Sequence, residues 1–294
     1  SIMNSPRQMP PTSRFGLPDL AYLKAMRVWD SYLTVSYRAE GELSLENVLA
    51  RLMPMIDAAG MERLCPLLDV GLATGSAEDE AAFLRNSKAV FSAFDRWPDR
   101  LLGIVKLNAN QVKASMDALN RWVRDGSMIG VYFSGGTRGA LPCSHPNFDP
   151  LVRRIGELGA MIMQHTWLQT GGKGKDVGTS TPSELAELAE RHPDVKFVCA
   201  HAGGEWEQGI RAVRGLPNIL VETSGFDPTA GFIEMAVREL GAGRIVFGSH
   251  FPSRSLGTEY SKIFNAQIPE QDKKLIMGEN LRALLKLILK KKGL

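Results

Sequence analysis

The chain alternates strand-like and helix-like segments eight times along most of its 294 residues. The expected strands are short apolar runs at residues 26–29, 63–70, 101–107, 128–133, 160–164, 195–200, 219–222 and 245–247. Between them apolar residues recur at helical spacing, as Leu45, Leu49, Leu52 and Ile56 do before Gly60 ends the pattern. Eight such units without a break in composition predict one (β/α)8 barrel, an α/β fold whose active site lies at the C-terminal ends of its strands.

The two ends of the barrel domain follow from the same pattern. Residues 1–20 contain four prolines and little apolar periodicity, so we expect them to form an irregular arm outside the barrel, which would then span residues 21–294. An open doubly wound sheet is the alternative fold, but no GxGxxG turn follows the first expected strand. Thr181 to Glu184 has the form of a capping box, which predicts a helix that starts at Pro182.

The composition excludes several classes of function. Apolar residues make up 44% of the chain, charged residues 23%, and the net charge is only +3, so no basic surface predicts nucleic-acid binding. No apolar run approaches the roughly 20 residues that span a membrane. Three widely spaced cysteines give no disulfide framework, which favours a cytoplasmic location. The chain begins at Ser1, which leaves a removed signal peptide open, and a homo-oligomer is equally left open.

Three of the five histidines stand where an expected strand ends, and this pattern suggests a site. They are His165, His201 and His250. A single histidine at such a place is most often a satisfied, partly buried residue. Three at equivalent strand ends predict a shared pocket, because parallel strands bring their C-terminal ends to one face. Imidazole is the most common metal ligand and moves protons near neutral pH, so this pocket suits a small-molecule substrate.

Several further motifs follow in a fixed order: Met55 to Gly60, His165-Thr166, His192 to Phe197, His201 to Gly204, Phe247 to Pro252, and Gly278 to Asn280. With these motifs, residues 26–290 resemble the amidohydrolase superfamily, in particular its amidohydrolase-related (amidohydrolase 2) branch. The resemblance implies one or two divalent metal ions, often zinc, at the barrel mouth. It also implies hydrolysis of amides, esters or lactones, or decarboxylation of aromatic or unsaturated acids.

The chain departs from the family pattern at places that the resemblance links to the metal. Tyr32 and Thr34 stand where the family's first strand has His-x-His, and His250 stands where its last strand has an aspartate. Tyr132 occupies the place of a modified lysine found in some relatives. We therefore expect a degenerate metal site that holds at most one ion, such as zinc, on His165, His201 and His250. The alternative is a pocket without metal.

Other candidates for the site are less specific. Arg138 and Arg254 are candidates to hold a substrate carboxylate, although exposed loop arginines are common. Trp167 and Trp206 follow the histidine-bearing strands and are candidate pocket walls, as is Tyr132, although packing against loops explains the tryptophans equally well.

Three further side chains are weaker candidates for the chemistry. Asp30 and Glu222 are candidate acid-base groups, the second only if its strand turns it into the barrel. A pair of Cys143 with His145 is disfavoured, because near neighbours in a proline-bounded loop rarely face each other.

Two kinds of function remain from the sequence. The first is a hydrolase that acts on a small organic acid, ester, amide or lactone, with a carboxy-lyase of the same branch as its variant. In it His201 or His250 transfers the proton and Tyr32 donates a hydrogen bond to developing negative charge. The second is a non-catalytic small-molecule binding barrel, since a fold does not determine a function.

Overall fold

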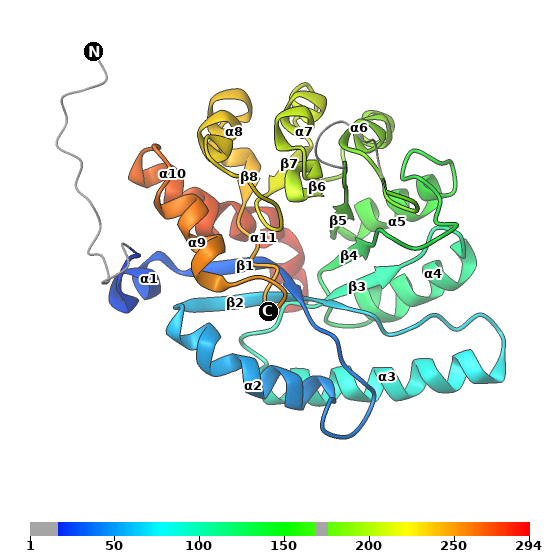
Figure 1. Cartoon of the computed structure of the whole chain (residues 1–294). Helices are drawn as coiled ribbons and strands as arrows, with labels where there is room; N and C mark the ends of the chain where they lie inside the picture. The colour runs from blue at the N-terminus through cyan, green and yellow to red at the C-terminus, as the bar shows by residue number, and fades with distance from the viewer. Residues whose placement is uncertain (1–16, 169–175) are drawn as a thin grey trace, which may run out of the picture.

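The computed structural model describes residues 17–168 and 176–294, and these form a barrel of parallel strands surrounded by helices (Figure 1). The eight strands are neighbours in the order of the sequence, and each adjacent pair is parallel. They are β1 (Val28–Thr34), β2 (Met61–Leu68), β3 (Ile104–Leu107), β4 (Gly130–Phe133), β5 (Met161–His165), β6 (Phe197–Ala200), β7 (Ile219–Glu222) and β8 (Ile245–Val246). The predicted (β/α)8 barrel is confirmed.

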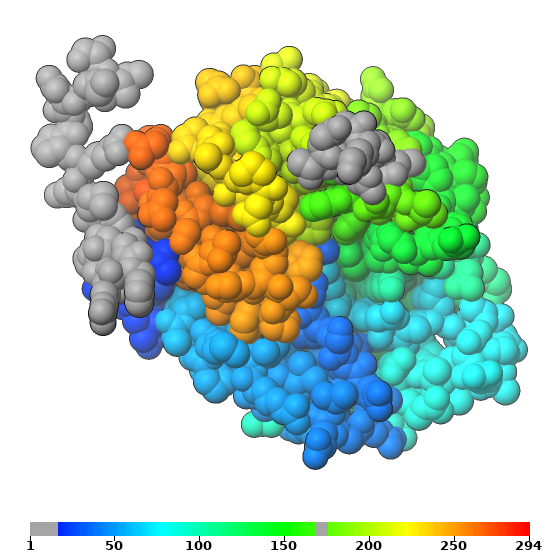
Figure 2. Space-filling model, in the orientation of Figure 1, coloured from blue at the N-terminus to red at the C-terminus, as the bar shows by residue number. Residues whose placement is uncertain are grey.

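The barrel closes where β1 meets the segment that follows β8. The backbone N–H of Ser31 donates to the carbonyl of Phe247 at 3.1 Å, and the N–H of His250 donates to the carbonyl of Tyr32 at 2.8 Å. These bonds exclude the open sheet, because an open sheet leaves its outer strands without partners. They also place His250 directly beside β1. In the space-filling view the orange segment of the chain, which contains α9, accordingly lies against the blue N-terminal part (Figure 2).

The helices of the described residues are α1 (Leu20–Met26), α2 (Leu45–Ala58), α3 (Ala77–Arg96), α4 (Val112–Leu119), α5 (Phe148–Leu158), α6 (Pro182–Arg191), α7 (Trp206–Val213), α8 (Phe232–Leu240), α9 (Leu256–Phe264), α10 (Glu270–Lys274) and α11 (Asn280–Lys292). Side-chain hydrogen bonds cap the starts of α1, α2, α3, α6 and α9. The capping box before α6 is present, with Glu184 N–H donating to the Thr181 hydroxyl and Thr181 N–H donating to the Glu184 carboxylate. In the part of the chain that the structure covers, no helix is long and apolar enough to cross a membrane.

The first strand differs from the prediction. Met26 ends helix α1, and β1 runs from Val28 to Thr34 instead of covering residues 26–29. The helix is set by Asp19, whose carboxylate accepts from the N–H of Tyr22, and by Leu23 and Met26, which are buried one turn apart. Helix α1 thus begins at the last residue of the predicted arm. Residues 1–16 lie outside the described residues, so the rest of the arm stays a prediction.

The strand register decides which side chains face the mouth of the barrel. Lys106 on β3, Tyr132 on β4 and Met163 on β5 are aligned across the sheet, so their side chains lie on the same face. Tyr132 contacts Tyr32 on β1 across the barrel interior. Lys106 therefore also lies on the inner side, near the C-terminal ends of the strands. Glu222, the last residue of β7, is fully buried and faces inward as well.

Candidate functional site

Four aromatic rings from separate strand ends converge at the C-terminal mouth of the barrel. The ring centre of His201 lies 4.8 Å from that of Tyr32, and 5.2 Å from those of both His165 and His250. Tyr32 and His250 are 5.1 Å apart by the same measure. The structure therefore brings together the four residues that the sequence places at the ends of β1, β5, β6 and β8. They form a single cluster.

These histidines line a cleft of about 320 Å³ together with Trp167, whose ring centre is 6.0 Å from that of His201. Two glycines keep the cleft open. A Cβ atom on Gly135 would lie 2.1 Å from His165 Nδ1, and one on Gly225 would lie 2.8 Å from His201 Nδ1. Neither position can carry a side chain without displacing an imidazole. Sequence reasoning missed both glycines, although each lies within three residues of the end of an expected strand.

Two of the histidines occupy strained backbone positions. His201 has φ 63° and His250 has φ 51°, in the left-handed region that residues other than glycine rarely adopt. Such positions cost on the order of 1–3 kcal/mol each and gather at functional sites. His201 directly follows β6, and His250 lies four residues after the end of the short strand β8. These backbone conformations turn both imidazoles toward the cleft.

The hydrogen bonds of His201 fix which of its ring nitrogens carries the proton. Its Nδ1 lies 2.8 Å from the carbonyl oxygen of Ser224, and because a carbonyl only accepts, Nδ1 must donate. The neutral ring then carries its lone pair on Nε2. Glu222 Oε2 lies 3.4 Å from the same Nδ1 and accepts from the His201 backbone N–H at 2.9 Å. A carboxylate thus stands behind the imidazole, as in a base that is oriented for proton transfer.

Glu222 stays ionised although it is completely buried. Burial alone raises the pKa of this carboxyl, but the hydrogen bonds and charge of His201, together with Ser224, hold the pKa below its ordinary value. The Ser224 N–H donates to Oε1 at 2.7 Å. The carboxylate is therefore available to stabilise a positive charge on His201.

His165 and His250 are neutral at physiological pH, because burial disfavours the charged form of each imidazole. Burial, together with the neighbouring His201 and His250, lowers the pKa of His165 to about 3. Burial, followed by the charge of His201, also lowers the pKa of His250. The Nδ1 atoms of both rings are buried and lack a hydrogen-bond partner among the described residues. Such atoms are costly unless a ligand or water pairs with them, which suits a binding cleft.

Asp30 lies below the cleft and joins β1 to the segment after β8. Its carboxylate accepts from the backbone N–H of Tyr32 at 3.0 Å, from the N–H of Ser249 at 2.8 Å, and from the Ser249 hydroxyl. Burial raises the pKa of Asp30 to about 6 in spite of these bonds. The group supports the strands that carry Tyr32 and His250.

The raised pKa of Asp30 predicts a pH dependence of folding. Between about pH 4 and 6 the unfolded chain loses this proton before the folded chain does, so Asp30 lowers stability as the pH rises. Asp30→Asn removes this dependence. From about pH 4.5 to about pH 7.5, its free energy of unfolding relative to the wild type should rise by on the order of 2 kcal/mol in urea titrations. Parallel profiles of the two proteins would contradict the assignment.

The structure does not bring two of the sequence candidates into the cleft. Arg254 is paired with both Asp227 and Glu259, and these carboxylates hold it away from a substrate. Trp206 packs against Phe232, and its indole N–H donates to the carbonyl of Pro228 at 2.9 Å. Both residues therefore support the loops around the site.

The loop after β4 also differs from expectation. Arg138 lines a separate pocket and does not reach the histidine cleft. Cys143 is buried, which raises the pKa of its thiol to about 12, and His145 Nδ1 accepts from the N–H of Asn147 at 3.1 Å. The disfavoured thiol–imidazole pair is therefore not formed.

The donor groups of the cleft do not reproduce a family metal centre. Among residues 17–168 and 176–294, no group of three or more His, Cys, Asp and Glu side chains is arranged to hold a metal ion. The Thr34 hydroxyl lies 3.3 Å from the carbonyl of Phe251 and 3.2 Å from the Ser253 hydroxyl. It contacts the segment after β8. The described residues thus form no ready metal centre, and the binding of one ion by His165, His201 and His250 stays a prediction.

Comparison with protein families and solved structures agrees with this fold. Residues 53–287 match the family model described as amidohydrolase. A curated relative, the uncharacterized protein y4mH of Sinorhizobium fredii, is 27% identical over 101 residues, or 28% of this chain. The match spans only about a third of that relative's length (34%).

Two solved structures illustrate the likeness. One is a dihydroxybenzoic acid decarboxylase from Polaromonas with bound manganese and the inhibitor 2-nitroresorcinol, with TM-score 0.68, 16% identity and coverage of 88% of this chain and 97% of that one. The other is the 4-oxalomesaconate hydratase of Rhodopseudomonas palustris, with TM-score 0.68, 14% identity and coverage of 90% and 98%. At these identities the likeness shows the fold.

Proposed function

The chain belongs to the amidohydrolase family, and from this premise we propose that it hydrolyses a small organic ester, amide or lactone at the mouth of its barrel. The observation that carries the proposal is the orientation of His201. Its Nδ1–H is held by the Ser224 carbonyl, its lone pair is on Nε2, and Glu222 stands behind it. This is the arrangement of a general base.

In this reaction His201 Nε2 takes a proton from a water molecule, which attacks the substrate carbonyl. Glu222 stabilises the imidazolium that forms, and the imidazolium then returns the proton to the leaving group. Both steps need the cleft to hold the substrate beside His201. Trp167 and the two neutral imidazoles of His165 and His250 provide its walls.

The developing negative charge needs a donor, and we assign this role to the tyrosine pair, which adjoins the cleft through the packing of Tyr32 against His201 and His250. The hydroxyls of Tyr32 and Tyr132 are 2.9 Å apart, so one donates to the other and the second proton has no partner within the pair. Burial raises the pKa of Tyr132 to about 12 and that of Tyr32 well above its ordinary value. Both groups thus keep their protons at neutral pH.

These steps need no metal ion. The number of metal ions that the protein binds is a separate proposal. We infer that the protein holds at most one divalent ion, because Tyr32 and Thr34 replace two imidazoles and His250 replaces a carboxylate. Manganese is bound in the similar decarboxylase, so zinc and manganese are both to be measured. Two equivalents of either metal in protein purified without chelator would contradict this inference.

The reaction is tested with a panel of small lactones, aryl esters and amides. We expect turnover of at least one class, and this turnover should survive dialysis against a chelator. A carboxy-lyase is the second candidate, because similar structures include a decarboxylase and a hydratase. It would release CO₂ from 2,6-dihydroxybenzoate without hydrolysing the panel. Binding of panel compounds with neither reaction would support the non-catalytic alternative.

A further inference from the structure

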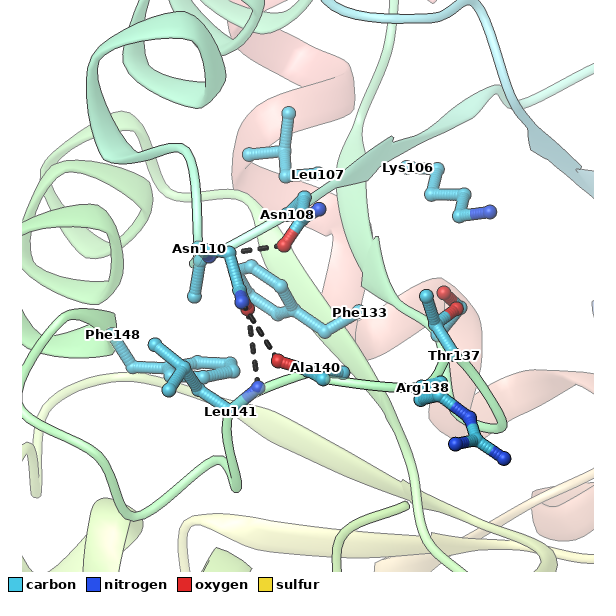
Figure 3. A pocket seen from close by; sticks show the side chains of 13 residues that line it. Lys106, Leu107, Asn108, Asn110, Phe133, Thr137, Arg138, Ala140, Leu141 and Phe148 are labelled. Atoms are coloured by element: carbon cyan, nitrogen blue, oxygen red, sulfur yellow. Dashed lines mark hydrogen bonds between the residues drawn. The ribbon is translucent and has the colours of Figure 1, made fainter. Parts of the chain in front are cut away.

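Three charged residues form a cluster on α9 and just before it. Arg254 precedes the helix, and Glu259 and Lys262 lie one turn apart within it. Glu259 binds Arg254 through Oε1 at 2.5 Å and Lys262 through Oε2 at 2.7 Å. We call these three residues the α9 cluster. Of the two arginines that the sequence suggested for the site, Arg138 lines a separate pocket (Figure 3), whereas Arg254 belongs to this cluster.

The pair at the centre of the α9 cluster is buried. The side chain of Glu259 is fully buried and that of Lys262 is 2% exposed. Burial lowers the pKa of Lys262, and the charges of Glu259 and Glu222 oppose that lowering. Removing two charges from water is costly, so such a pair adds little stability compared with apolar side chains of similar size. What the pair provides is a fixed geometry for the groups that it contacts.

Lys262 holds the segment of residues 223–228, which follows β7. Its Nζ donates to the carbonyl of Thr223 at 3.2 Å and lies 4.6 Å from the ring centre of Phe226. Phe226 is itself buried against Phe232 of α8, with ring centres 4.8 Å apart. Residues 224 and 225 lie between these two contacts, so Lys262 fixes the segment on both sides of them.

Arg254 links the same cluster to the segment after β8. Its backbone N–H donates to the carbonyl of His250 at 3.0 Å, and its guanidinium binds the carboxylate of Asp227. The two segments that adjoin the histidine cleft after β7 and β8 are thus attached to one set of buried charges.

The residues that Lys262 fixes are the ones that touch His201. The Ser224 carbonyl accepts from His201 Nδ1 at 2.8 Å, and the Ser224 N–H donates to Glu222 at 2.7 Å. The segment approaches the ring closely, because a Cβ atom on Gly225 would lie 2.8 Å from the same Nδ1. A hydrogen bond weakens steeply when its length and angle change. A small movement of this segment would therefore release the proton of His201 Nδ1.

We propose that Lys262 is a positioning residue for His201. By holding the carbonyl of Thr223, it keeps the Ser224 carbonyl where it accepts the proton of His201 Nδ1, so that the lone pair of the ring stays on Nε2. Without Lys262 the segment moves, and the tautomer with its proton on Nε2 becomes populated. That tautomer cannot act as the base. The effect on catalysis rests on the proposed function, whereas the effect on the tautomer does not.

Nuclear magnetic resonance of protein labelled with ¹⁵N-histidine tests the tautomer directly. The wild type should give a slowly exchanging Nδ1–H signal, which is assigned to His201 by its absence in His201→Ala. Lys262→Met should lose at least about half of this signal to the Nε2–H tautomer. Lys273→Met is the matched control, because Lys273 is also a buried lysine and donates to the carbonyl of Phe264, the last residue of α9, at 2.7 Å. It should keep the signal.

Kinetics separate a positioning role from a merely structural one. Lys262→Met should lower kcat about tenfold or more with KM nearly unchanged, because Lys262 acts on the base and does not contact the substrate. In a His201→Ala background the same change should lower kcat by less than about twofold, because the ring through which it acts is absent. A merely structural role would lower kcat equally in both backgrounds. If Lys262→Met does not fold, Lys262→Met with Glu259→Gln takes its place, because this pair of changes leaves no buried carboxylate without its lysine.

A folded Lys262 variant with the wild-type Nδ1–H signal would overturn the proposal, as would equal losses of kcat in the two backgrounds. A protein that hydrolyses nothing, yet loses the signal in the Lys262 variant, would contradict only the proposed function. Hydrolysis that depends on His201, together with an unchanged signal in the Lys262 variant, would contradict only the positioning role.

Discussion

His201→Ala is expected to lower kcat about 10³-fold for any substrate that the protein hydrolyses, with KM almost unchanged. Among the described residues, the substitution removes the only ring whose Nδ1 lies against both a backbone carbonyl and a carboxylate. Steady-state kinetics with a purified, folded variant measure the effect. Because the imidazole takes the proton only during reaction, the loss should fall on kcat.

Two further variants make this result specific. His145→Gln is the matched control, because His145 lies on the loop after β4 and does not line the cleft. It should keep the wild-type rate. His250→Gln should lose less activity than His201→Ala, because His250 lacks a carboxylate partner. Equal losses in His201→Ala and His250→Gln would contradict the assignment of His201 as the base.

Glu222→Ala is expected to lower the free energy of unfolding by about 3–5 kcal/mol. The fully buried carboxylate accepts from the backbone N–H groups of His201 and Ser224, and alanine leaves both without a partner in a water-poor cavity. The same change frees the imidazole of His201, so activity should also fall. Urea unfolding followed by circular dichroism measures the stability.

Two control variants distinguish the stability cost of losing the buried acceptor from the cost of losing a charge at the surface. Glu222→Gln keeps one acceptor oxygen and should cost about half as much. Glu157→Ala removes an exposed partner of Arg154 and should change stability by less than about 1 kcal/mol. The pKa of Glu222 is lowered, so its contribution is present above about pH 4.5 and is lost as the pH falls through the folded pKa. Stability of Glu222→Ala should therefore converge on the wild type in acid.

The strands and helices with clear periodicity were predictable, and the exceptions have local causes. The strand at residues 219–222 agrees with the prediction at both ends, and helix α6 starts at Pro182 as its capping box predicts. The predicted first strand was misplaced because an apolar residue such as Met26 fits a buried helix as well as a buried strand. Its place in α1 depends on the capping by Asp19 and on packing with residues distant in the sequence. The pattern of apolar residues in one sequence does not show which distant residues will pack against Met26.

The site was predictable in its histidines but less so in their partners. Strand ends are visible in the sequence, so the convergence of His165, His201 and His250 follows from the barrel. That Arg254 would be held by Asp227 and Glu259 depends on how two loops fold against each other. Lys106 was overlooked because it lies inside an apolar run, and only the strand register shows that it shares a face with Tyr132.

The bonds that join β1 to the segment after β8 connect residues far apart in the sequence, and the hydroxyl of Ser31 and the carbonyl of Phe247 are 216 positions apart. During synthesis the first strand therefore leaves the ribosome long before its partner exists. Until then β1 is a bare sheet edge that other chains can pair with. The cleft is completed by the same late event, because His250 reaches Tyr32 only when the ring of strands closes. Nearly the whole chain must therefore be translated before the cleft can bind a ligand. The same closure of the barrel covers the exposed edge of β1 and so protects the chain from aggregation.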